Sequence, residues 1–379
     1  VTGVEIDGVA HGWALRNLRV DANSPANTTA GILAGGGAGT AAVSTVAATN
    51  IIQTLTQARI GGGAQVVAQN NIAVSARNLD SILGSAVSAA GAGNAAIAAL
   101  ATVNVVETNT KAFIDGPGTS VSALAVDASD KLLVDSGALN NAPSDDHEWI
   151  QAEQFNPYPS LSIAQHQING LAVQASSVQQ VGQIALSASL AVVPLASAAV
   201  SGVVNTTVLG GSTLGYIDGA SINQATGAGS AQNVRVGANS HSYTAGYLAA
   251  AAGGPSAAAV GSGVDNTVIS RLTQARLSNT LLNSRGLTEV LAGSGQYVST
   301  LIASLAGAIV APGVSSSVVV LNGETEALID GSSALDVGSL KVSATALQSL
   351  SPNAASITGG AVAVSGALSV LYNQSTTRA

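Results

Sequence analysis

The sequence predicts an all-β protein, a β-solenoid of the parallel β-helix kind, from three observations. The chain repeats itself along its length, its longer runs alternate between apolar and polar residues, and Gly or Asn interrupts them about every 10 to 20 residues. Runs rich in Val, Ile and Thr with a period of two are typical of strands. Tandem units too thin to enclose a core alone must stack on one another, as in a solenoid.

A valine in a V-x-A step marks each repeat, and a second apolar residue, Ile or Leu, precedes it. The valines are Val20, Val74, Val126, Val173, Val236, Val290 and Val342. The preceding residues are Ile6, Ile60, Ile114, Ile217, Leu277 and Ile329, and the fourth unit lacks a clear member. This spacing predicts a single continuous array over residues 1–379, built from about seven tandem units of roughly 54 residues.

The length of the unit leaves the coil number open. A solenoid coil commonly takes about 20 to 27 residues. A unit of roughly 54 residues is therefore either two such coils or one wide coil.

An Asp-Gly pair follows the second apolar residue in several units. The aspartates are Asp7, Asp115, Asp218 and Asp330. Glycine accepts positive φ and Asp can bind nearby backbone amides, so we expect these four residues to form turns. They fall in units one, three, five and seven, which predicts that adjacent units share no metal through this position.

Arginine occurs one step before the turn in the even units, as Arg59 and Arg276. Such a two-unit alternation would place unlike neighbours beside each other and help to set the register of the strands. The hypothesis requires Arg59 to lie near Asp7 or Asp115.

Residues 134–160 interrupt the repeat and are predicted to be an irregular insertion. In a solenoid, insertions become loops on one face. Three interpretations stay open. The loop is solvated and its aromatic residues pack back onto the coil; or Trp149, Phe155 and Tyr158 anchor a glycan or protein partner; or the acidic run and His147 form a metal or catalytic site. The weak candidates for a Ca²⁺ site are Asp145, Asp146 and Glu148, whose oxygens suit that ion.

Composition limits the classes of function. The net charge is −8 and only 8% of residues are charged, which argues against a nucleic-acid interface. The apolar stretch from Ile184 is interrupted by serines and Pro194, and we expect buried strands there, with no membrane span. The one fragment similar to a Ca²⁺-binding roll, at Gly261–Asp265, is a single copy where tandem copies are needed. No hydrolase, zinc-protease or P-loop motif occurs, so we expect no enzyme and no cofactor, with Ca²⁺ as the one weak candidate.

The segments "NTKAFIDG…LAVDAS", "YIDG…VRVGANS" and "ALIDG…LKVSATA", with the Gly-rich alternating runs between them, resemble the repeat regions of large secreted bacterial adhesins of the filamentous-haemagglutinin-like kind. The resemblance implies an extracellular, cell-surface location and a structural or adhesive role without catalysis. Neighbouring copies, flanking repeats or surface glycans are the partners that it implies.

Neither end carries an obvious polar cap, so we expect either a longer repeat array or copies that stack end to end into filaments. The alternative to this role is a carbohydrate-active or ligand-binding solenoid that uses the 134–160 loop.

Overall fold

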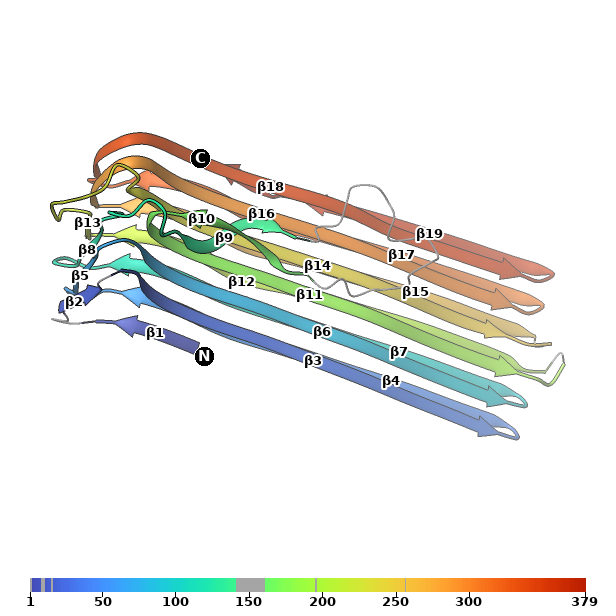
Figure 1. The fold of residues 1–379 in the computed structure, drawn as a ribbon. Helices are drawn as coiled ribbons and strands as arrows, with labels where there is room; N and C mark the ends of the chain where they lie inside the picture. Colours follow the sequence, from blue (N-terminus) through green and yellow to red (C-terminus); the bar gives the residue numbers. More distant parts are fainter. Residues whose placement is uncertain (1, 8–10, 15, 141–160, 195, 256) are drawn as a thin grey trace.

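The computed structural model describes residues 2–7, 11–14, 16–140, 161–194, 196–255 and 257–379. These residues form strands, turns and bends, and no helix occurs among them, which confirms the all-β prediction. In particular, this part of the chain has no helix that could cross a membrane. The long strands lie side by side in a flattened slab (Figure 1), and they pair in parallel, as expected for a β-solenoid.

The slab consists of two parallel sheets. Sheet A contains β1 (Thr2–Ile6), β4 (Ala41–Ile60), β7 (Ala95–Asp115), β12 (Ala198–Asp218), β15 (Ala258–Ser278), β17 (Val310–Asp330), β19 (Val362–Asn373) and β20 (Thr376–Arg378). The long strands of sheet B are β3 (Leu18–Ala38), β6 (Ile72–Ala92), β11 (Gly170–Ala191), β14 (Asn233–Gly253), β16 (Leu281–Gly307) and β18 (Ala334–Gly359). Its short strands are β2 (His11–Ala14), β5 (Gln65–Ala68), β8 (Ser120–Ala123) and β13 (Ser221–Ile222).

One coil consists of a strand of sheet B, a turn, and a returning strand of sheet A (Figure 1). Coils 1 to 6 are formed by β3–β4, β6–β7, β11–β12, β14–β15, β16–β17 and β18–β19. The end of the slab at these turns is termed distal here, and the end with the short strands proximal. Each repeat is therefore one wide coil, which decides between the two alternatives that the sequence left open.

The strand register corrects the repeat count. Six of the seven predicted valines are partners in one ladder of sheet B, in the order Val20, Val74, Val173, Val236, Val290 and Val342. Val126 is absent from the ladder, lies outside the strands and is 60% exposed. Val74 and Val173 are neighbours because coils 2 and 3 are adjacent in the stack, and the residues between β8 and β11, which include Val126, add no coil. The described part of the chain thus contains six coils with paired valines instead of seven.

The second predicted set of residues forms a matching ladder in sheet A. Its partners run in the order Ile6, Ile60, Ile114, Ile217, Leu277 and Ile329. No residue is missing from this ladder at the fourth predicted unit. β7 and β12 are adjacent strands of sheet A, and Ile114 and Ile217 are direct partners. Both ladders point between the sheets and form the largest apolar cluster of the core, at the proximal end.

The core narrows from the proximal to the distal end. Alternate residues of each strand point inward, so the two sheets enclose successive layers of side chains. Beyond the proximal cluster come Ile, Val and Leu layers, and the last layer, beside the distal turns, consists of alanine. Alanine allows the sheets to approach where the chain turns from one to the other. Buried polar layers lie between the apolar ones, among them the ladder Thr56, Thr110, Thr213, Thr273 and Thr325.

Candidate functional site

The predicted recognition and metal residues cannot be placed. Trp149, Phe155 and Tyr158 lie outside the described residues, as do Asp145, Asp146 and Glu148. The structure does describe the base of the insertion on both sides of them.

The base of the insertion is an antiparallel hairpin of β9 (Leu132–Leu139) and β10 (Ile163–Ile168). The chain leaves sheet B after β8 and returns to it at β11, so the departure covers 124–169 and is wider than the predicted 134–160. Leu139 and Ile163 pack with Val178, Tyr243 and Tyr297, which belong to β11, β14 and β16. The hairpin therefore lies on the outer face of sheet B (Figure 1).

Polar contacts hold β9 to the same face. Nε of Arg77 donates to Oδ2 of Asp135 at 3.2 Å, and its Nη2 makes a second contact with Oδ1. Arg235 donates through Nη2 to the carbonyl of Ser136 at 2.9 Å and through Nη1 to Glu289 at 2.9 Å. The buried carboxylate of Asp135 is thus paired with a cation, as a buried charge requires.

His241 lies beneath the hairpin. Its Nε2 is 3.1 Å from the carbonyl oxygen of Gly137, to which an Nε2–H would donate. Burial lowers the pKa of His241 to about 4, against the smaller opposing effect of that hydrogen bond. The imidazole is consequently neutral near pH 7 and serves as a docking contact.

Grooves flank the hairpin on both sides. On one side, a groove of about 370 Å³ runs between Gly137–Leu139 and the outer residues of β16 and β18, including Tyr297 and Lys341. On the other side, clefts of about 200 and 460 Å³ share Arg77 and Gln165. Guanidinium, carboxylate and amide groups line these clefts beside apolar side chains, a combination suited to a polar, partly apolar ligand.

The predicted Asp-Gly turns are present in three of the four cases. Asp115, Asp218 and Asp330 each end a strand of sheet A. The glycines that follow them, Gly116, Gly219 and Gly331, have φ values of 94°, 69° and 64°. These values lie in the left-handed region that glycine enters without steric cost. Asp7 directly follows β1. The residue after it lies outside the described part of the chain, so the fourth predicted turn is not tested.

The predicted alternation of these carboxylates along the stack is wrong. Asp115 and Asp218 are direct partners, because β7 of coil 2 and β12 of coil 3 are adjacent strands of sheet A and no further coil separates them. Their side chains have separate partners: Asp115 accepts from Arg59 at 2.8 Å and Asp218 from Asn279 at 3.1 Å. Among the described residues, no group of three or more His, Cys, Asp or Glu side chains could hold a metal ion.

The predicted proximity of Arg59 to the turn carboxylates is confirmed. Besides Asp115, its guanidinium contacts Asp7 at 3.4 Å and also Glu5. Its carbon Cζ lies 5.7 Å from the ring centre of Phe113, its register partner in the next coil. Phe113 in turn stacks on Tyr216 with 4.8 Å between ring centres. Burial raises the pKa of Tyr216 to about 12.

Sequence reasoning missed the charged groups in the interior. Asp80 is buried, and Oδ2 accepts hydrogen bonds from Thr54 at 2.7 Å and Thr108 at 2.5 Å. Arg271 is buried two coils away and donates to Ser177 and Thr213. Burial raises the pKa of Asp80 and lowers that of Arg271 to about 10. The one sequence signal that could have shown their burial is the period-two alternation within each strand, which places Asp80 and Arg271 at inward positions.

Asp265 is enclosed in the same way. It is the acidic residue of the fragment similar to a Ca²⁺-binding roll, and it points into the core with no exposed surface. Oδ1 accepts from Asn205 at 2.6 Å. Burial raises the pKa of Asp265 to about 6.

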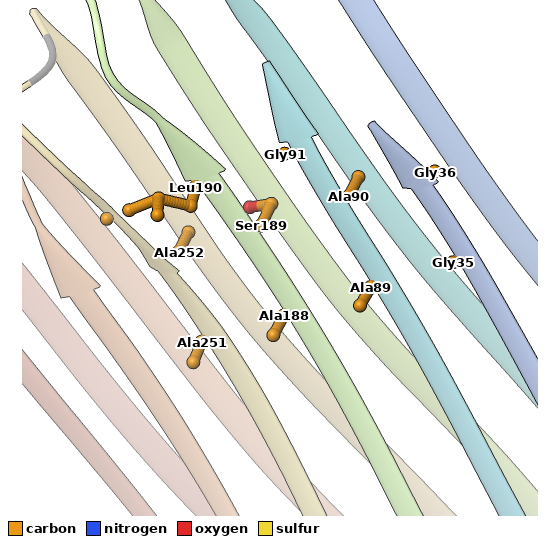
Figure 2. Close-up of a pocket in the computed structure, with 11 residues that line it drawn as sticks. Gly35, Gly36, Ala89, Ala90, Gly91, Ala188, Ser189, Leu190, Ala251 and Ala252 are labelled. Carbon is orange, nitrogen blue, oxygen red and sulfur yellow. The ribbon is translucent and has the colours of Figure 1, made fainter. Parts of the chain in front are cut away.

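A further hollow, of about 580 Å³, lies on the distal part of sheet B. Figure 2 shows that its lining consists of small residues, with Ala89, Ala188 and Ala251 on neighbouring strands and Leu190 as the largest side chain. This hollow carries no charged group that could orient a ligand.

Comparison with known proteins adds no relative: no family model, no curated protein and no solved structure matches the chain.

Proposed function

We propose that this chain is a structural and adhesive segment of an extracellular bacterial fibre or giant adhesin, in which coils stack into a long rod. One observation carries the proposal: parallel ladders run in register through six coils of nearly constant width. Since each coil hydrogen-bonds to the next through strands of about 21 residues, the stack resists extension and shear along its whole width.

The edges of the stack support assembly. β3 pairs with β6 alone and β18 with β16 alone among the described strands, so each has one edge of backbone N–H and C=O groups without a strand partner. Such edges pair readily with further strands of the same geometry. Further repeats or a second copy would therefore extend the rod without changing its construction.

A non-catalytic role agrees with the pairing or burial of several described acids, and the two carboxylates that line a cleft beside the hairpin, Asp21 and Asp135, are paired with Arg19 and Arg77. Asp115 and Asp330 pair with Arg59 and Arg276 at turns, whereas Asp80 and Asp265 are enclosed in the core. None of these four presents a free carboxylate to a surface groove, where a substrate would bind.

The second candidate function is ligand binding at the insertion, and the grooves beside the β9–β10 hairpin favour it. A glycan array distinguishes the two candidates. Binding that is lost on Trp149→Ala would support recognition through the loop, while binding unaffected by Trp149→Ala, Phe155→Ala and Tyr158→Ala would exclude these anchors.

Electron microscopy and fibre diffraction of the isolated chain test the structural proposal, with and without Ca²⁺. Strands of 21 residues predict a ribbon about 70 Å wide, and six coils at about 4.8 Å predict roughly 29 Å of ribbon per chain. A 4.8 Å reflection along the ribbon axis would support end-to-end stacking. Discrete particles at every concentration would overturn it, and assembly only with Ca²⁺ would revive a metal site in the insertion.

A further inference from the structure

The charged residues of this chain are distributed unequally over the slab. The distal half of the coils comprises residues 27–52, 81–106, 180–209, 243–269, 297–321 and 349–373. This half contains one charged residue, Asp265, and its side chain points into the core. Both outer faces of the distal half are therefore free of charge.

The outer face of sheet A in this half is strongly apolar. Its outward positions lie in six rows across the coils. The large apolar residues of these rows with more than a third of their surface exposed in coils 1 to 5 are Val43, Ile51, Ile97, Val103, Val200, Val204, Val310 and Val314. Val43 is 64% exposed and Val314 is 56% exposed. Parallel sheets normally have both faces covered, and contiguous apolar patches of this kind mark interaction sites.

The shape of this face suits another flat sheet. Its backbone is already paired within sheet A, so only side chains are available to a partner. In coils 1 to 3 one row contains the β-branched residues Val43, Ile97 and Val200. The neighbouring row is small at Ala99 and Gly202 and bulky again at Val314 in coil 5. Ridges and troughs of this kind interdigitate when two sheets pack face to face about 10 Å apart.

The area agrees with a stable pair of chains. Six rows at about 6.7 Å and six coils at about 4.8 Å span roughly 33 by 24 Å, or roughly 800 Å² per partner. This is the area of a standard-sized protein interface. A lipid partner fits less well, since sheets that face lipid carry aromatic residues at both membrane boundaries and this face has one aromatic residue, Tyr372, in its outermost coil.

We propose that the distal outer face of sheet A is an interface between two copies of this chain, which pack face to face. This lateral contact goes beyond the proposed end-to-end stacking and does not depend on it. It would double the thickness of a ribbon and leave the strand edges free.

Val204 and Leu186 provide a matched pair for the test. Both are in coil 3 and in the uncharged half, and they are 44% and 42% exposed, but Val204 is on sheet A and Leu186 on sheet B. The masses of the native chain, Val204→Lys and Leu186→Lys are measured by sedimentation velocity, with circular dichroism as the check on folding. We expect the native chain and Leu186→Lys to have twice the mass of Val204→Lys under the same conditions, whatever the extent of end-to-end stacking, with at least a tenfold loss of lateral association in Val204→Lys. Thr206→Lys, at an outward position that is already polar, replaces Val204→Lys if that variant does not fold.

A single-copy native chain at tens of micromolar, or a paired Val204→Lys, would overturn the interface. Loss of association in both variants together with flotation on phosphatidylcholine vesicles would assign the face to lipid and also overturn it. Electron microscopy separates this proposal from the proposed function. Ribbons of single thickness would retain end-to-end stacking and exclude the lateral interface, whereas discrete pairs without ribbons would do the reverse.

Discussion

Nε of Arg59 lies 2.8 Å from Oδ1 of Asp115, although 56 residues separate them in the chain. The contact is diagonal: Arg59 pairs in register with Phe113 of the next coil, and its guanidinium reaches two residues further along β7. The contact with Asp7 extends in the opposite direction along the stack. A single guanidinium therefore bridges residues on either side of its own strand.

Arg59→Ala should reduce stability by roughly 1 kcal/mol, since its ion pairs are partly exposed but form a network with Asp115, Asp7 and Glu5. Urea unfolding of the native chain, Arg59→Ala, Asp115→Ala and the double variant measures the coupling between the two residues. Arg276→Ala and Asp330→Ala, whose side chains are more exposed, form a control cycle with a smaller coupling. Equal coupling in both cycles would contradict the bridging role of Arg59.

Gly61→Ala should disrupt the same contact without removing either charge. A Cβ at this position would lie 2.7 Å from Nε of Arg59 and also overlap Oδ1 of Asp115, so the ion pair must separate. We expect a loss of about 1 kcal/mol in urea unfolding, no larger than that of Arg59→Ala, because the atoms that must shift are the ends of two flexible, partly exposed side chains. Gly91→Ala is the control, because its Cβ would meet no atom within 4 Å. The explanation fails if Gly61→Ala remains as costly in the Arg59→Ala background.

The sequence was sufficient for the fold class, the two ladders and the neighbours of Arg59. It was insufficient for the coil number, because a period of two marks the face of a residue and carries no information about where a long strand ends. Val126 shows why the repeat count failed: its V-x-A step has the same letters as Val74 but lies outside the strands. The Asp115–Asp218 contact was missed for the same reason, since it depends on which units are neighbours in space.

Arg77→Ala should release the β9–β10 hairpin from sheet B. The variant would leave the carboxylate of Asp135, which is 5% exposed, without its cation. Removing one partner of a buried ion pair costs about 3–5 kcal/mol, and undocking of the hairpin avoids that cost. Hydrogen exchange should accelerate in Leu132–Leu139 while the strands of coils 4 to 6 keep their protection. Arg19→Ala, which removes an exposed ion pair with Asp21, is the control, and faster exchange throughout the slab would argue against local undocking.

Asp265→Asn should stabilise the protein above pH 6. The pKa of Asp265 is raised from 3.8 to about 6 in the folded state, because burial disfavours the charged form. Below about pH 4 the carboxyl is protonated in both states and the variant is neutral. Between about pH 4 and 6 the unfolded chain releases the proton while the folded chain keeps it, so native stability falls as pH rises. Above that window the expected gain is on the order of 2–3 kcal/mol.

Asp330→Asn supplies a control of opposite sign. A hydrogen bond from Arg276 lowers the pKa of Asp330, so its carboxylate contributes stability above about pH 4 that is lost as the pH falls through the folded pKa. Asp330→Asn should therefore be destabilising at pH 7 and neutral at low pH. Urea unfolding of both variants from about pH 2 to 8 gives two difference curves that diverge as pH rises. Parallel curves, or a destabilised Asp265→Asn at pH 7, would show that the Asp265 carboxylate has a compensating partner in the core.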